Sequence, residues 1–138
     1  MGVYYLTFHT VPPQTSESEP YEYQVAVIDG ILSHVDIGFP RGCVGLAHLQ
    51  LYYKHHQLYP TNPEQSFAWD NHIFSFDDDF PIYEQPYVIT VRAWNDDDSY
   101  EHTLMVGLSV TAAALPSGPP VAELVGWPGA PIEGEIPY

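Results

Sequence analysis

Apolar and polar residues alternate with a period of two through most of the first 111 residues, and no long stretch has the helical period. Successive side chains of a strand point to opposite faces of a sheet, so this alternation predicts half-buried β-strands. The clearest examples are Val3–Thr10 (VYYLTFHT), Pro86–Trp94 (PYVITVRAW) and His102–Thr111. Tyr4 and Phe8 share one face of the first of these. We therefore expect an all-β chain.

Nine segments carry the strand signal, and proline, glycine, aspartate and asparagine residues separate them. They are Val3–Thr10, Tyr21–Ile28, Ile31–Phe39, Val44–Tyr53, His56–Tyr59, Ser66–Trp69, His72–Phe76, Pro86–Trp94 and His102–Thr111. Short strands at regular spacing are typical of two packed antiparallel sheets. The sequence predicts an antiparallel β-sandwich of about eight or nine strands. Jelly-roll and immunoglobulin-like topologies fit equally well, and a closed barrel is the alternative.

A tight turn is predicted at Asp29-Gly30, between the second and third segments. This dipeptide tolerates the positive φ angles of a two-residue type I′ turn. The pair is the strongest hairpin signal in the chain. We therefore expect Tyr21–Ile28 and Ile31–Phe39 to be neighbours in one sheet.

Trp94 is out of phase with the apolar residues of its own strand. Ile89, Val91 and Ala93 are expected to face the core, so Trp94 lies on the opposite face. We predict that Trp94 is an exposed aromatic residue that faces solvent or another subunit.

The composition changes after the last strand and divides the chain into a β domain, residues 1–115, and a proline- and glycine-rich segment, residues 116–138. Such composition is typical of a disordered linker. The segment nevertheless carries large apolar side chains, which disordered tails usually lack. We expect an extended C-terminal arm that contacts neighbouring subunits. The residues expected at that interface are Val121, Leu124, Trp127, Ile132, Ile136 and Tyr138.

The charge of the chain restricts its partners. Eighteen acidic residues against only Arg41, Lys54 and Arg92 give a formal net charge of −15. Three cations cannot neutralise a series of phosphates, so nucleic acid and anionic membranes are disfavoured as partners. No signal peptide is evident, and no apolar run approaches the roughly 20 residues of a membrane span. We expect a soluble protein that does not insert into membranes.

No arrangement of residues indicates catalysis or a bound cofactor. His48, His55 and His56 lack the spacing of a zinc site. No serine lies in a nucleophile elbow, and the segment Gly42–Gly45 is not followed by the lysine of a phosphate-binding loop. We predict no catalytic, cofactor-binding or metal-binding residues, and we do not expect an enzyme.

Two acidic runs, Asp77–Asp79 and Asn95–Asp98, leave calcium open as an alternative. Clustered carboxylates can supply several of the oxygen ligands that calcium needs. Neither run has the glycine and the closing glutamate of an EF-hand loop. Aspartate and asparagine also favour turns by bonding to their own backbone, and this is the preferred interpretation.

Five segments together form a distinctive series: Phe39–His48, His56–Pro63, Phe67–Asp70, Pro86-Tyr87 and Trp94–Thr103. Across residues 3–115 this series resembles a group of small uncharacterised β-sandwich proteins from environmental bacterial and phage-like sequences. The resemblance implies an association with virion structural genes. It implies no catalytic or binding residue, and residues 116–138 fall outside it.

The expected function is therefore that of a non-enzymatic structural protein. We expect a virion component, such as a capsid or decoration protein, that contacts itself or other structural subunits through its C-terminal arm. A homo-oligomer or larger assembly, in a virion or an extracellular assembly, follows from this expectation. The alternative is a carbohydrate-binding or adhesion module that uses exposed aromatic residues and acidic loops.

Overall fold

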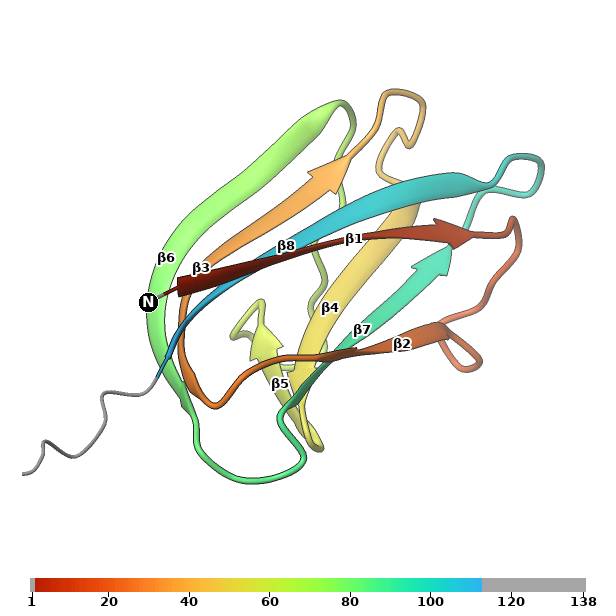
Figure 1. The fold of residues 1–138 in the computed structure, drawn as a ribbon. Helices are drawn as coiled ribbons and strands as arrows, with labels where there is room; N and C mark the ends of the chain where they lie inside the picture. Colours follow the sequence, from red (N-terminus) through yellow and green to blue (C-terminus); the bar gives the residue numbers. More distant parts are fainter. Residues whose placement is uncertain (1, 113–138) are drawn as a thin grey trace, which may run out of the picture.

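Residues 2–112, the part of the chain that the computed structural model describes, form eight β-strands and no helix (Figure 1). The strands are β1 Gly2–Val11, β2 Tyr21–Ala26, β3 Gly30–Phe39, β4 Ala47–Tyr53, β5 His56–Tyr59, β6 His72–Ile82, β7 Val88–Asn95 and β8 His102–Ala112. All pairings are antiparallel. Within the described residues, no helix is long and apolar enough to span a membrane.

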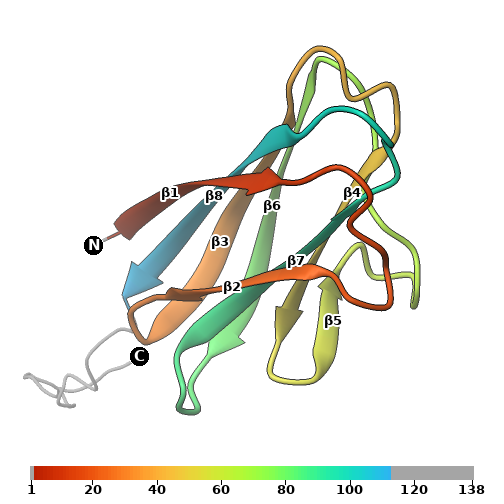
Figure 2. The same ribbon diagram turned by 90° about the vertical axis from the view of Figure 1, so that its right-hand side faces the viewer.

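The strands form two sheets of four that pack face to face (Figure 2). Sheet A has the order β1-β8-β3-β6, and sheet B has the order β2-β7-β4-β5. The chain can be described as one long antiparallel hairpin with its tip at the β4–β5 turn. Its successive strand pairs are β4·β5, β3·β6, β2·β7 and β1·β8, and these pairs alternate between the two sheets. This is jelly-roll connectivity, an antiparallel β-sandwich of eight strands. The predicted fold class is thus confirmed, and the strand order selects the jelly roll over the immunoglobulin-like topology.

The core lies between the inner faces of the two sheets. Every second residue of the central strands is buried there, as the period of two predicts. Sheet A contributes Leu32, Val35, Ile37, Leu104, Val106, Leu108 and Val110, and sheet B contributes Leu49, Leu51, Ile89 and Val91. Aromatic rings pack at the margin of the core between the edge strands β5 and β6, where the ring centroids of Tyr59 and Phe76 lie 5.0 Å apart.

Most predicted strands agree with the structure to within two residues at each end, and the larger differences occur at three places. Ser66–Trp69 is not a strand, because only Phe67 forms an isolated bridge, to Leu49. β4 begins at Ala47 because the backbone of Val44 has a positive φ of 49°, which ends extended structure. β6 continues through the acidic run to Ile82, since an edge strand tolerates a proline such as Pro81.

The hairpin predicted at Asp29-Gly30 is wrong. β2 belongs to sheet B and β3 to sheet A, so the chain crosses between sheets at this point. Gly30 is required for another reason: a Cβ at this position would overlap the carbonyl group of Thr111 on β8. The glycine therefore permits close strand approach rather than a turn.

Buried Asn95 ties together the loops at one end of the sandwich. Its side-chain amide donates hydrogen bonds to the carbonyls of Val11 (3.2 Å) and Tyr100 (2.9 Å). Its Oδ1 accepts a hydrogen bond from the amide of Asp97 at 3.0 Å. Because the bonds to Val11 and Asp97 are buried, these two backbone groups have no ready substitute partner there.

Replacing Asn95 with alanine should therefore lower the free energy of unfolding by about 2 kcal/mol, because buried backbone groups lose their partners. Chemical denaturation of Asn95→Ala against wild type measures this difference. Asn62→Ala is the matched control, since Asn62 is exposed, and it should change stability by less than about 0.5 kcal/mol. Equal effects of the two substitutions would contradict the role given to Asn95.

Candidate functional site

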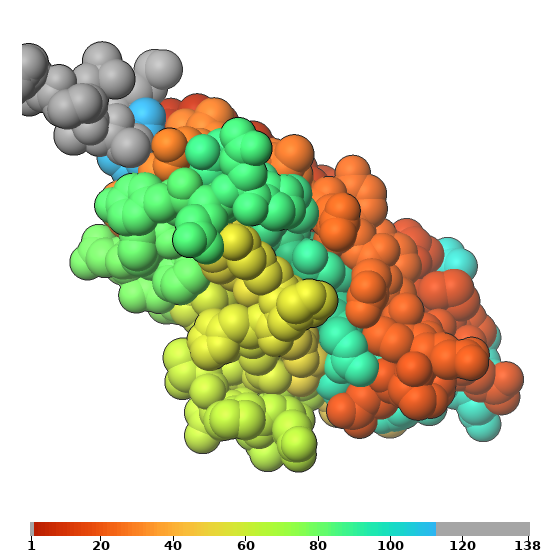
Figure 3. Space-filling view, turned by 90° about the horizontal axis from the view of Figure 1, so that it is seen from below, coloured from red at the N-terminus to blue at the C-terminus, as the bar shows by residue number. Residues whose placement is uncertain are grey.

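A polar groove of about 750 Å³ crosses the outer face of sheet B. In Figure 3 the surface is hollowed over β7 (teal), between β2 (orange) and β4–β5 (yellow). The groove is lined by Glu17, Glu22, Gln24, Gln50, Tyr52, Lys54, His55, Glu64, Thr90 and Arg92. Two of the three cations in the sequence, Lys54 and Arg92, thus lie in one groove.

Strand register places the groove residues in rows across the sheet. Arg92 on β7 lies between Glu22 on β2 and Gln50 on β4. In the next row, Thr90 lies between Gln24 and Tyr52. All of these side chains project outward from sheet B, because the residues before and after them on each strand point into the core. The floor of the groove is therefore a grid of hydrogen-bonding side chains.

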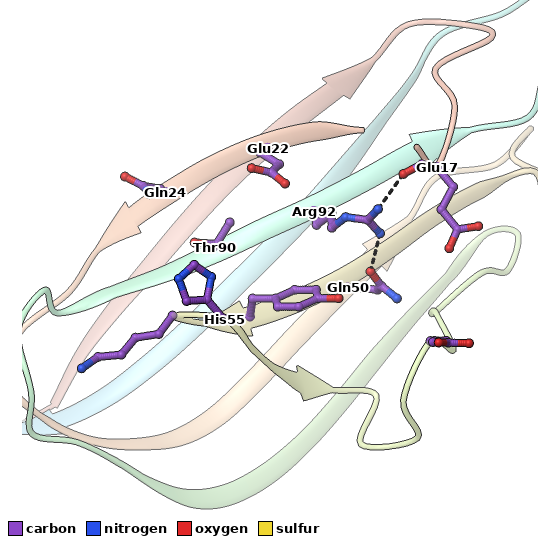
Figure 4. Close-up of a pocket in the computed structure, with 10 residues that line it drawn as sticks. Glu17, Glu22, Gln24, Gln50, His55, Thr90 and Arg92 are labelled. Carbon is purple, nitrogen blue, oxygen red and sulfur yellow. Dashed lines mark hydrogen bonds between the residues drawn. The ribbon is translucent and has the colours of Figure 1, made fainter. Parts of the chain in front are cut away.

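Arg92 occupies the centre of this grid (Figure 4). Its guanidinium donates to Oε1 of Gln50 at 2.7 Å and to the backbone carbonyl of Glu17 at 2.5 Å. Among the ion pairs of residues 2–112, none joins Arg92 to a carboxylate. A guanidinium has five N–H donors, so Arg92 is fixed in place and keeps donors for a ligand.

The prediction that Trp94 is exposed is wrong. Trp94 does lie on the outer face of sheet B, as its phase indicates, but only 5% of its surface is accessible. The ring of His48 stacks on it with centroids 5.0 Å apart, and the guanidinium of Arg92 lies 5.2 Å from its ring centroid. Side chains of its own sheet therefore cover Trp94. The Trp94 ring in turn stabilises the position of the Arg92 guanidinium through a cation–π contact.

The outer face of sheet A is different because one complete row across it is apolar. Phe8 on β1 lies beside Met105 on β8, Met105 beside Gly38 on β3, and Gly38 beside Ile73 on β6. Phe8 and Ile73 are 64% and 56% exposed. A shallow hollow of about 550 Å³ follows this row. We call these four residues the apolar row.

A polar network occupies the same face next to the apolar row. The Tyr4 hydroxyl reaches over Gly107 and donates to Asp36 at 2.7 Å. The two ring nitrogens of His34 lie 3.0 Å from Asp36 and 2.5 Å from Asp77. Ser75 also donates to Asp36, at 2.6 Å. Polar contacts therefore fix one part of this face, whereas Phe8 and Ile73 of the apolar row are exposed in the described part of the chain.

These contacts shift the acidity of the groups that make them. Hydrogen bonds to Asp77 and then Asp36 raise the pKa of His34, so the imidazolium is favoured. Burial opposes ionisation of Asp36, but hydrogen bonds from Ser75, Tyr4 and His34 outweigh it and lower the pKa of this carboxyl. Burial and the bond to Asp36 raise the pKa of Tyr4 to about 12.

The two acidic runs take different structural roles. Asn95–Asp98 runs from the end of β7 into the following turn, where Oδ1 of Asp97 accepts hydrogen bonds from the amides of Ser99 (2.9 Å) and Tyr100 (3.2 Å). Asp77–Asp79 lies within β6, and there Asp78 accepts a hydrogen bond from the Tyr59 hydroxyl. Turn chemistry thus accounts for the first run only. In residues 2–112, no three His, Cys, Asp or Glu side chains are grouped so that they could hold a metal ion.

The histidines singled out in the sequence do not converge. His48 contacts Asp96 (3.0 Å) and Ser66 (2.9 Å) at one side of sheet B. His55 and His56 are exposed at the β4–β5 turn.

The arm residues predicted to form an interface lie outside the described residues. These are Val121, Leu124, Trp127, Ile132, Ile136 and Tyr138.

Sequence reasoning missed both outer faces as candidate sites. One available signal was the strand Val3–Thr10, in which both faces carry large apolar or aromatic residues. The other was Arg92, a cation on the polar face of the strand that ends at Trp94.

Comparison of the sequence with models of protein families gives no match, and comparison with curated proteins gives no significant match.

The His34 network predicts a specific titration. The pKa of His34, followed by NMR, should lie above the usual value of about 6.5. Asp77→Asn should lower it, because the substitution removes a charged acceptor, whereas Asp79→Asn should leave it nearly unchanged. A raised pKa means that stability from protonated His34 is fully present below the unfolded-state pKa and is lost as pH rises through the folded-state pKa. Equal effects of the two variants would contradict the assignment.

Proposed function

We propose that this chain is a non-enzymatic structural protein that assembles with copies of itself or with other subunits, most specifically as a component of a virion. Two contact regions take part: the apolar row of sheet A and the C-terminal arm, residues 116–138. The observation that carries the proposal is the uncovered apolar row on a chain with a net charge of −15. Exposed apolar side chains in a contiguous row mark surfaces that meet other proteins.

Charge and fold both support this proposal. A strongly acidic surface repels its own copies, so contacts that form in spite of it need uncharged patches or screening. The apolar row provides such a patch on one face. Jelly rolls serve as capsid domains and as lectins, so the fold is compatible with a structural role.

The size of the full-length protein in solution tests the proposal. Sedimentation over a range of concentrations should show species larger than one chain. Ile73→Lys places a charge within the apolar row and should shift these species to smaller sizes. Tyr83→Lys is the matched control, because Tyr83 is exposed but lies outside the row. Removal of residues 116–138 should also reduce the size. A protein that stays monomeric at every concentration would contradict the proposal.

A second candidate function, binding of a neutral carbohydrate, is favoured by the groove of sheet B. Arg92 is held by Gln50 and the Glu17 carbonyl; in register, Glu22 lies beside Arg92 and Gln24 lies beside Thr90. Planar amide, carboxylate and guanidinium groups pair with neighbouring sugar hydroxyls, and a tyrosine such as Tyr52 can contact a sugar ring. The glutamates that rim the groove disfavour anionic glycans.

Binding of neutral oligosaccharides, screened on a glycan array and measured by calorimetry, tests this candidate. Glu22→Ala should weaken binding about tenfold, because a carboxylate acceptor in the groove is lost. Glu101→Ala makes the same change at an exposed site outside the groove and should have no effect. The absence of any bound glycan, or an equal effect of both variants, would overturn the carbohydrate assignment.

A further inference from the structure

Strand β1 differs from the other three strands at the edges of the two sheets. Edge strands expose unpaired backbone groups, and proteins usually protect them with charges, prolines or short length. β6 carries three aspartates and Pro81, β5 has only four residues, and β2 has six residues including Glu22. β1 has ten residues and contains no charged side chain and no proline.

The absence of charge extends beyond β1. No Asp, Glu, Lys or Arg occurs from residue 2 to residue 16. His9, which lies in this stretch, is buried, and burial lowers its pKa, so the strand stays neutral at pH 7. Two molecules that each carry a net charge of −15 can therefore meet along β1 without opposing charges from the strand itself.

The side chains of β1 also suit contact with an identical strand. Tyr4, Leu6 and Phe8 lie on the outer face and are 49%, 48% and 64% exposed. A two-fold axis perpendicular to the sheet pairs β1 with its copy in antiparallel fashion and keeps both outer faces on the same side. These three residues then lie beside the same three residues of the other copy. Apolar and aromatic cross-strand pairs of this kind stabilise a sheet.

We propose that two copies of this chain pair through β1, so that their two sheets A form one continuous eight-stranded sheet. This inference rests on the proposed function and names the first contact of the assembly. The contact is isologous, because the same strand serves on both molecules, and it leaves the part of the apolar row on β8, β3 and β6 free for later contacts. Within residues 2–112, β1 has β8 as its only sheet neighbour, so one side of β1 is available for this pairing.

A substitution on the edge strand tests the pairing. Leu6→Lys should raise the dissociation constant of the two-copy species by about tenfold or more, since the lysine lies at the new strand junction. Ile73→Lys makes the same change on the same outer face, but on β6 at the opposite edge of sheet A. It should leave the two-copy species intact. Both variants reduce the net negative charge equally, so a difference between them does not come from total charge.

Hydrogen exchange of the wild-type protein provides a measurement that needs no variant. The β1 amides that point away from β8 should exchange more slowly as the protein concentration rises, because pairing protects them. Raising the salt concentration to about 0.5 M should tighten the pairing, since screening weakens the repulsion between two acidic molecules.

Several results would overturn the pairing. Equal weakening by Leu6→Lys and Ile73→Lys would assign the contact to the outer face as a whole. Loss of the two-copy species on removal of residues 116–138, with concentration-independent exchange in β1, would assign it to the arm. Both results leave the proposed assembly standing. A wild-type protein whose β1 exchange does not depend on concentration also overturns the pairing. The proposed function fails only if sedimentation of the full chain shows no association at all.

Discussion

Burial of the two inner sheet faces against each other is the interaction on which the rest of this structure depends. The described residues contain no helix, and with Cys43 as the only cysteine no intrachain disulfide can add stability. Apolar side chains from both sheets must therefore supply most of the favourable free energy of folding. Because they occupy every second position, the remaining positions are free to give each outer face its own chemistry.

The two outer faces differ in character because of this freedom. On sheet B, Glu22, Arg92 and Gln50 form a polar row supported by buried Trp94. On sheet A, the apolar row and the His34 network share one surface. The two faces also differ in their positively charged residues, since two of the three cations of the chain line the groove of sheet B. One fold thus presents two surfaces of different chemistry.

The alternation of residues predicts the fold class and most strand positions, because burial of one face acts on local sequence. It does not predict which strands share a sheet. Asp29-Gly30 has the composition of a hairpin, yet long-range pairing of β2 with β7 and β3 with β8 prevails over that local preference. The exposure of Trp94 also depended on distant residues: His48, on another strand, covers it. The groove could not be predicted either, because its rows join residues far apart in the chain.

The register of β1 with β8 has a consequence for synthesis of the protein. Gly2 pairs with Thr111 and Val11 with His102, so the two strands that meet are almost the full domain apart in sequence. Strand β1 is made before the other strands of this domain and has no sheet partner among them until β8 follows about a hundred residues later. A strand without charged side chains thus stays unpaired until β8 is made, and chains growing side by side on one messenger RNA can meet along it before either has folded.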